Sequence, residues 1–154
     1  MSHPLLCWDI ASTSIYKLLY DPKSIDLYRL KELAKKYNWI IDIQKLIADN
    51  TYEALIVTNN QQNILWTNEG FTGMTGYSAS FTKNKRPSFL QGANTSGIVK
   101  RRIREQLAEN LIINETIINY RKSGKSYECD LHILPLFNHT ANCTHYIALE
   151  KTLN

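Results

Sequence analysis

The sequence predicts an α+β domain, in which one five-stranded antiparallel sheet carries helices on one face and is preceded by a helical extension. Three observations point to this class. The length of 154 residues suits one domain with an appendage. A change of composition near Asp49 divides a helical extension, residues 1–49, from residues 50–154. After this boundary, two short strands, a run of helical segments and three longer strands follow in order, which favours one antiparallel sheet.

The extension, residues 1–49, contains three predicted helices. A first segment over residues 10–20 ends at Asp21-Pro22, and Ser24 is the expected N-cap of the second helix. The second helix has one apolar stripe, formed by Leu30, Leu33, Ala34, Tyr37, Ile40 and Ile41. The third helix carries Ile43, Leu46 and Ile47. We expect the stripe to be buried, either over the open face of the sheet or in a homodimer formed through these helices.

The second part, residues 50–154, begins with a hairpin whose β-rich runs, residues 55–58 and 64–67, are joined by a polar turn. Residues 68–92 are expected to be irregular with short helical turns, and residues 96–110 to form a helix. The apolar side chains of that helix that should face inward are Ile98, Val99, Ile103 and Leu107. Three longer strands then follow at residues 112–121, 127–137 and 144–151.

The composition excludes several classes of protein. Hydrophobic residues make up 44% and charged residues 21%, which is typical of a globular domain and not of a disordered tail. No apolar run approaches the roughly 18 residues of a membrane span, and the N-terminus does not resemble a secretory signal. The three cysteines are far apart and odd in number, which argues against a disulfide framework. We therefore expect a cytoplasmic protein with no membrane contact.

The motifs in the sequence give little support for an enzyme, a metal site or a nucleic-acid-binding surface. Residues 123–126 imitate the end of a phosphate-binding loop but lack its first glycine, and no nucleophile–base pattern is found. The spacing of the C-terminal histidines and cysteine, His132, His139, Cys143 and His145, fits no common zinc site. Residues 70–104 hold seven basic and no acidic side chains, yet they contain no recognition motif. We expect a protein that is not an enzyme, and nucleic acid is an improbable partner.

Two segments resemble a known family. Residues 86–92, Arg-Pro-Ser-Phe-Leu-Gln-Gly, and residues 118–125, Ile-Asn-Tyr-Arg-Lys-Ser-Gly-Lys, are similar to the two flavin-binding motifs of LOV photosensors, a branch of the PAS superfamily. Phe71 and the segment from Thr75 to Tyr77 also fall where that family has a Phe–Thr–Tyr pattern. The resemblance covers roughly residues 52–151 and implies the PAS fold.

The resemblance also implies a binding site for FMN. Gln91 and Asn119 stand where the family hydrogen-bonds the flavin ring, and Arg104 stands where it contacts the phosphate, with Arg86 or Arg101 as possible substitutes for a second arginine. Cys129 replaces an asparagine of the family, and Glu150 replaces its final glutamine. The expected lining of the site is Ile56, Thr58, Leu90, Leu131 and Ile133. Pro87 takes the place of the cysteine that forms the family's light-driven adduct, so flavin would be held noncovalently.

Two functions follow from this resemblance. The first is a sensory domain that binds FMN and responds to light or redox change without a cysteinyl adduct. In that case burial would favour a protonated Glu150, which could donate a hydrogen bond to the flavin. The second is a PAS module without ligand that serves protein association or dimerisation. In both cases we expect the output to pass to an unknown protein partner.

Overall fold

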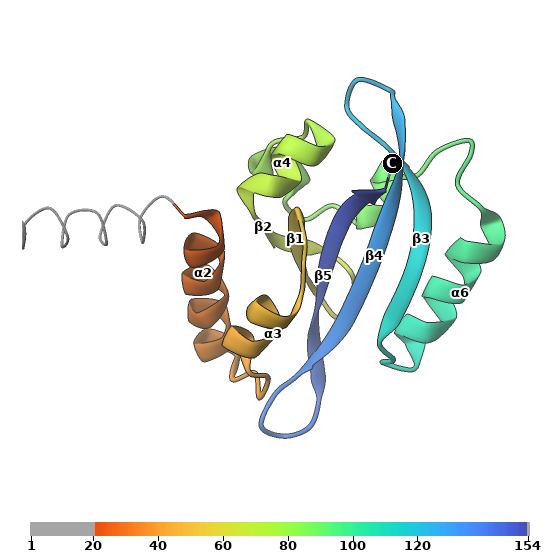
Figure 1. Cartoon of the computed structure of the whole chain (residues 1–154). Helices are drawn as coiled ribbons and strands as arrows, with labels where there is room; N and C mark the ends of the chain where they lie inside the picture. Colours follow the sequence, from red (N-terminus) through yellow and green to blue (C-terminus); the bar gives the residue numbers. More distant parts are fainter. Residues whose placement is uncertain (1–20, 154) are drawn as a thin grey trace, which may run out of the picture.

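The structure, a computed structural model, describes residues 21–153. Five strands form one sheet in the spatial order β2-β1-β5-β4-β3, and every neighbouring pair is antiparallel (Figure 1). The strands are β1 (Ala54–Asn59), β2 (Ile64–Thr67), β3 (Ile113–Tyr120), β4 (Ser126–Phe137) and β5 (Cys143–Leu153). The helices are α2 (Pro22–Tyr37), α3 (Ile43–Asp49), α4 (Glu69–Thr75), α5 (Ala79–Thr82), the 3-10 helix η1 (Pro87–Leu90) and α6 (Gly97–Ala108). The predicted α+β fold with a five-stranded antiparallel sheet is confirmed.

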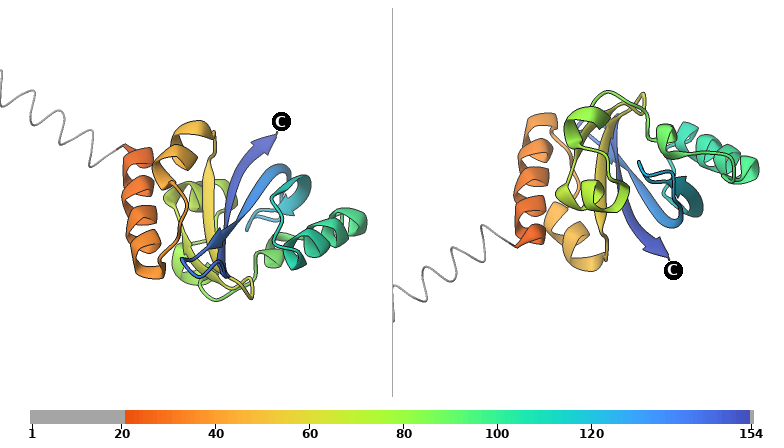
Figure 2. Two further views of the ribbon diagram at one scale, coloured as in Figure 1. Left: turned by 90° about the horizontal axis from the view of Figure 1, so that it is seen from below. Right: turned by 90° about the horizontal axis from the view of Figure 1, so that it is seen from above.

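Side chains alternate between the two faces of the sheet, and each face has its own core. On the inner face, Ile56 and Ile133 pack with Phe71 of α4, Leu90 of η1 and Leu107 of α6. On the outer face, a second buried group joins the extension to β1, β4 and β5, and its members include Leu30, Trp39, Leu55, Leu136 and Ile147. Figure 2 shows α2 and α6 on opposite sides of the molecule. The helices between β2 and β3 thus serve one face, and the extension covers the other.

The ends of α2 differ from the prediction. Asp21 is the N-cap and Pro22 the first helical residue, so Ser24 lies inside the helix and is not its cap. Proline suits this first position because its fixed φ is helical and its missing N–H would have no partner there. Asn38 adopts the left-handed conformation with φ 56°, which ends the helix before Ile40. Ile40 is 63% exposed and therefore does not belong to the buried stripe.

The prediction for α6 is also wrong at one position. Ser96 caps the helix, since its side chain accepts a hydrogen bond from the N–H of Val99. Val99, Ile103 and Leu107 face the inner core at a spacing of four residues. Ile98, in contrast, is 60% exposed, because one step along a helix turns a side chain by about 100° away from its neighbour.

The five predicted strands are confirmed, with shifts of at most two residues at their ends. Ile43, Leu46 and Ile47 are buried on α3, as predicted. Gly124 closes the β3–β4 turn with φ 89°, which a residue with a side chain rarely adopts. The predicted helix over residues 10–20 lies outside the described residues. Within residues 21–153, none of the helices has both the length and the apolar character needed to cross a bilayer.

A buried polar cluster fixes α2 to the sheet. The Asp26 carboxylate, 5% exposed, accepts hydrogen bonds from the Tyr52 hydroxyl and from Nδ2 of Asn68, each at 3.0 Å. Oδ1 of Asn68 in turn accepts from the N–H of Leu55 on β1 and from that of Phe71 on α4. One asparagine therefore links α2, β1 and the start of α4.

Candidate functional site

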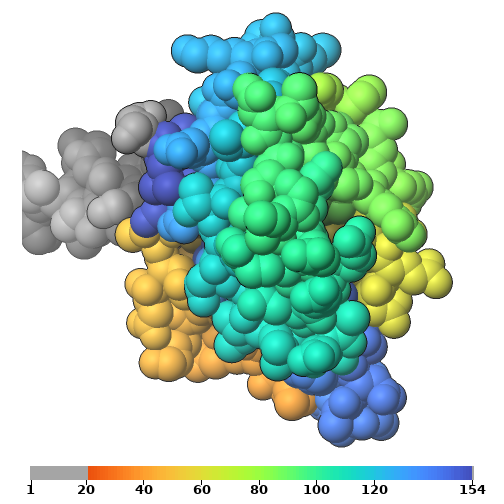
Figure 3. Space-filling view, turned by 90° about the vertical axis from the view of Figure 1, so that its right-hand side faces the viewer, coloured from red at the N-terminus to blue at the C-terminus, as the bar shows by residue number. Residues whose placement is uncertain are grey.

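A cavity of about 110 Å³ lies between the inner face of the sheet, η1 and α6. Figure 3 shows α6 and the segment before it packed over this side of the molecule. Most of its walls are apolar. The lining residues are Ile56, Thr58, Gln62, Pro87, Ser88, Leu90, Gln91, Ile103, Leu107, Ile117, Asn119, Leu131, Ile133, Tyr146, Ala148 and Glu150.

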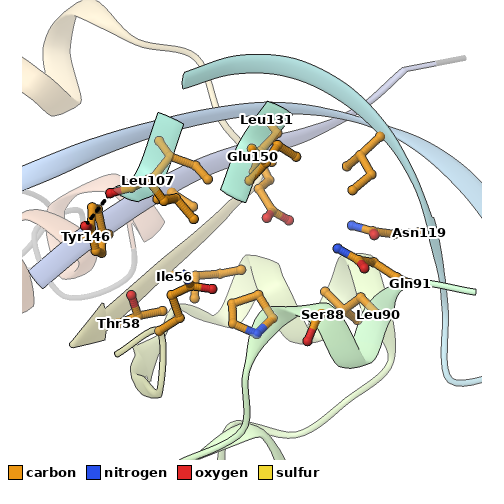
Figure 4. A pocket seen from close by; sticks show the side chains of 16 residues that line it. Ile56, Thr58, Ser88, Leu90, Gln91, Leu107, Asn119, Leu131, Tyr146 and Glu150 are labelled. Carbon is orange, nitrogen blue, oxygen red and sulfur yellow. Dashed lines mark hydrogen bonds between the residues drawn. The ribbon is translucent and has the colours of Figure 1, made fainter. Parts of the chain in front are cut away.

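One end of the cavity is polar. Gln91 follows η1 and Asn119 lies near the end of β3, so two segments far apart in the sequence bring their amides to the same place. Figure 4 shows both amides directed into the cavity, and neither is bonded to another lining residue. Asn119 is 5% exposed. Each amide can offer an N–H donor and a C=O acceptor to a ligand.

Glu150 projects into the cavity from the central strand β5, where its backbone neighbours are Ala54 of β1 and Leu131 of β4 (Figure 4). Its carboxyl group is buried, and desolvation raises its pKa to about 7. The hydrogen bond that it accepts from the Cys129 thiol has the opposite, smaller effect. A large fraction of Glu150 is therefore protonated near neutral pH and can act as a hydrogen-bond donor.

The other end of the cavity carries the neutral polar groups of Thr58 and Tyr146 (Figure 4). The Tyr146 hydroxyl lies 3.1 Å from the carbonyl oxygen of Leu107 and 2.7 Å from Oδ1 of Asn110. These contacts join β5 to the end of α6. The Tyr146 hydroxyl thus fixes the end of α6 against β5. Burial raises the pKa of this hydroxyl to about 12.

The structure brings together eight of the eleven residues predicted for the cofactor site. They are Ile56, Thr58, Leu90, Gln91, Asn119, Leu131, Ile133 and Glu150. Three predicted residues do not line the cavity: Arg86, Arg104 and Cys129. Both arginines are exposed, Arg86 as the N-cap of η1 and Arg104 on α6. Cys129 is fully buried beside Glu150 and lies outside the lining.

Several lining residues were missed by the sequence analysis. Tyr146 and Ala148 lie four and two positions before Glu150 on β5, so strand alternation alone could have placed them on the same face. Gln62 belongs to the β1–β2 turn and has φ 67°. Nothing in the local sequence indicates that this turn reaches the cavity.

Among the described residues, Pro87 lines the cavity and no cysteine does. Of the two cysteines that the structure describes, Cys143 lies outside the cavity and its thiol donates to the carbonyl oxygen of His145. Burial and the nearby Glu150 carboxyl raise the pKa of Cys129 far above the ordinary thiol value. Since the thiolate is the nucleophilic form, the fold disfavours the reactive form of Cys129.

The fold and the cavity define a class, a small α+β domain whose curved sheet closes with its helices around a mainly apolar pocket. A family model described as "PAS domain" matches residues 53–151. The chain belongs to the PAS domain family. Its structural neighbours are LOV domains, as the resemblance implied.

Three similar proteins illustrate the range of this family. A "blue-light-activated histidine kinase" of Brucella canis is 32% identical over 108 residues, which are 67% of this chain and 22% of the kinase. A human voltage-gated inwardly rectifying potassium channel is 26% identical over 131 residues, 81% of this chain and 12% of the channel. The LOV domain of an Erythrobacter litoralis blue-light-activated histidine kinase superposes with a TM-score of 0.64 at 25% identity and covers 68% of this chain and 99% of that domain. The chain spans about a fifth or less of the length of the kinase and of the channel.

Proposed function

We propose that this chain is a sensory PAS/LOV-like domain that binds a flavin noncovalently and responds to light or redox conditions. It is not an enzyme in this proposal, and it acts in the cytoplasm on a protein partner. The observation that carries the proposal is the polar end of the apolar cavity, where Gln91, Asn119 and Glu150 point toward one another (Figure 4). The similarity to blue-light-activated kinases supports it.

The residues of the cavity fit the ring system of a flavin. The pyrimidine edge of the ring presents an N–H donor between two carbonyl acceptors, and the amides of Gln91 and Asn119 offer the matching acceptors and donors. Apolar side chains such as Ile56 and Leu131 would cover the flat faces. A bound flavin would supply blue-light absorption and reversible reduction.

Glu150 would contribute a proton at the same edge. In its protonated form the carboxyl group can donate a hydrogen bond to a ring nitrogen or carbonyl oxygen. In its ionised form it can only accept, and it would repel the electron-rich edge of the ligand. With its pKa raised to about 7, Glu150 changes between these forms within the physiological range. We therefore propose that Glu150 makes flavin binding depend on pH.

The absence of a thiol from the described lining supports noncovalent binding. Pro87 stands where the resemblance places the adduct-forming cysteine, and it has no nucleophilic atom. The buried thiol of Cys129 donates its hydrogen to Glu150 and lies outside the lining. The sensor of this proposal therefore works through hydrogen bonding around the ring.

An absorption spectrum of the freshly purified chain, in darkness and after blue light, tests the proposal. We expect a structured flavin band that changes under illumination without the bleaching typical of a covalent adduct. The Gln91→Leu variant should bind flavin roughly fivefold more weakly, since it loses one hydrogen bond of about 1 kcal/mol. Gln61→Leu, in the exposed β1–β2 turn, is the matched control. A colourless protein that does not bind added flavin would overturn the proposal, and adduct-type bleaching would overturn its noncovalent part.

A second candidate function is homodimerisation through the N-terminal helices, and one observation favours it. Ile25 and Tyr28, one helical turn apart on α2, are 40% and 61% exposed on the side turned away from the sheet. Exposed apolar side chains on one stripe are typical of an association surface. Sedimentation velocity of the full chain tests this: we expect a dimer that the Tyr28→Glu variant converts to monomer. A monomer over the full concentration range would argue against it.

A further inference from the structure

We infer that the cavity selects an uncharged flavin of the riboflavin class over a flavin that carries a terminal phosphate. This inference rests on the proposed function, in which the ligand is a flavin. Glu150 is the single acidic side chain in the lining, and every other lining side chain is apolar or neutral. An anionic ligand would therefore meet no positive partner within the cavity of the described structure.

None of the basic side chains of η1 and α6 lines the cavity. Arg102 on α6 donates to both carboxylate oxygens of Glu115 at 2.7 and 2.9 Å. Nζ of Lys85 lies 4.5 Å from the centre of the Phe81 ring. The remaining basic side chains of η1 and α6 all lie outside the lining and are Arg86, Lys100, Arg101 and Arg104. Their attraction for a phosphate at the mouth of the cavity would be screened by solvent and salt.

Both ends of the cavity lack a positive charge. At one end stand the amides of Gln91 and Asn119, and at the other the neutral groups of Thr58 and Tyr146. A phosphate needs charge-assisted hydrogen bonds to replace its hydration, and neutral donors replace it only in part. Ionised Glu150 would add repulsion above neutral pH. A ligand with hydroxyl groups in place of the phosphate avoids both penalties.

The test compares the affinities of the chain for riboflavin and FMN, measured by quenching of flavin fluorescence at pH 6.5 and low salt. We expect riboflavin to bind at least as tightly as FMN. The Arg86→Gln/Arg104→Gln double variant should leave the riboflavin affinity unchanged and weaken FMN binding by less than threefold. FMN binding that exceeds riboflavin binding tenfold, and that is lost in the double variant, would overturn the inference.

A gain-of-function variant provides the positive control. Ser88 lines the cavity and is exposed on η1, so an arginine at this position can reach the cavity without disturbing the core. We expect Ser88→Arg to raise the affinity for FMN at least tenfold relative to the affinity for riboflavin. An equal effect on both ligands would count against charge selection. Failure of the chain to bind either flavin would overturn the proposed function, and this inference with it.

Discussion

The thiol of Cys129 donates a hydrogen bond to Oε2 of Glu150, with a distance of 3.6 Å between sulfur and oxygen. The two residues lie on neighbouring strands, β4 and β5, and both are buried under the candidate site. Burial raises the pKa of each group. A carboxyl group that titrates near neutral pH and a thiol that keeps its proton are thus neighbours at the polar end of the cavity.

The first prediction concerns stability as a function of pH. Since the pKa of Glu150 is raised to about 7 in the fold, its contribution is fully present below the unfolded value near 4.5 and is lost as the pH rises through 7. Glu150→Gln should therefore become more stable than the original chain above pH 8, by up to about 3 kcal/mol. Urea unfolding of both proteins at pH 5 and pH 8.5 measures this. An equal difference between them at the two pH values would contradict it.

The second prediction concerns the reactivity of Cys129. Because the raised pKa of this thiol leaves almost no thiolate, alkylation in the folded chain at pH 8 should be at least a hundredfold slower than in urea. Peptide mass spectrometry after pulses of iodoacetamide measures each cysteine separately. Half-buried Cys143 provides the internal comparison and should react faster. Comparable rates for the two thiols would show that the strands open more readily than their burial implies.

The third prediction concerns Asn68, whose side chain links three elements. Asn68→Ala removes the cap of α4, removes the acceptor for the N–H of Leu55 and leaves buried Asp26 with one donor fewer. We expect a loss of about 2–4 kcal/mol in the free energy of unfolding. Asn50→Ala, which loses one bond to the carbonyl oxygen of Leu46, is the control and should cost about 1 kcal/mol or less. Equal losses in the two variants would contradict the linking role.

The fourth prediction concerns acid pH. Nε1 of Trp39 donates to Nδ1 of His145 at 3.2 Å, and burial lowers the pKa of this histidine. A lowered pKa means that the unfolded chain takes up the proton first, so stability falls as the pH drops below about 6.5. The protonated ring can no longer accept from the indole. Urea unfolding monitored by tryptophan fluorescence should show a larger loss between pH 7 and pH 5 than in His145→Phe, and an identical loss would refute this.

The fold was predictable because its determinants are local. Strand alternation around Ile56 and Leu131, and the helical spacing of Leu30 and Leu33, each identify one buried face. The cap at Ser24 was wrong because the helix begins two residues earlier, at Pro22, whose fixed φ suits the first helical position, and the Ser24 hydroxyl donates to Oδ2 of Asp21.

The site was predictable where side chains are short and fixed by strands, as for Asn119 and Glu150. Arg86 and Arg104 were placed by analogy at the cofactor, yet exposed arginines on η1 and α6 take their positions from solvent and neighbouring charges. The contribution of Gln62 depends on the path of a turn, which the sequence does not determine. The raised pKa of Glu150 depends on burial by several elements and requires the assembled fold.

The position of α2 and α3 over the outer face of the sheet has a consequence for any partner of this domain. A protein that docks on β1 and β5 must first displace a segment that is covalently attached to them. The attached segment competes at an effective concentration in the millimolar range, whatever the abundance of the partner. Weakly binding partners therefore fail to displace this segment. Only a partner that also weakens the hydrogen bonds of Asp26 or Trp39 gains access to the outer face of the sheet.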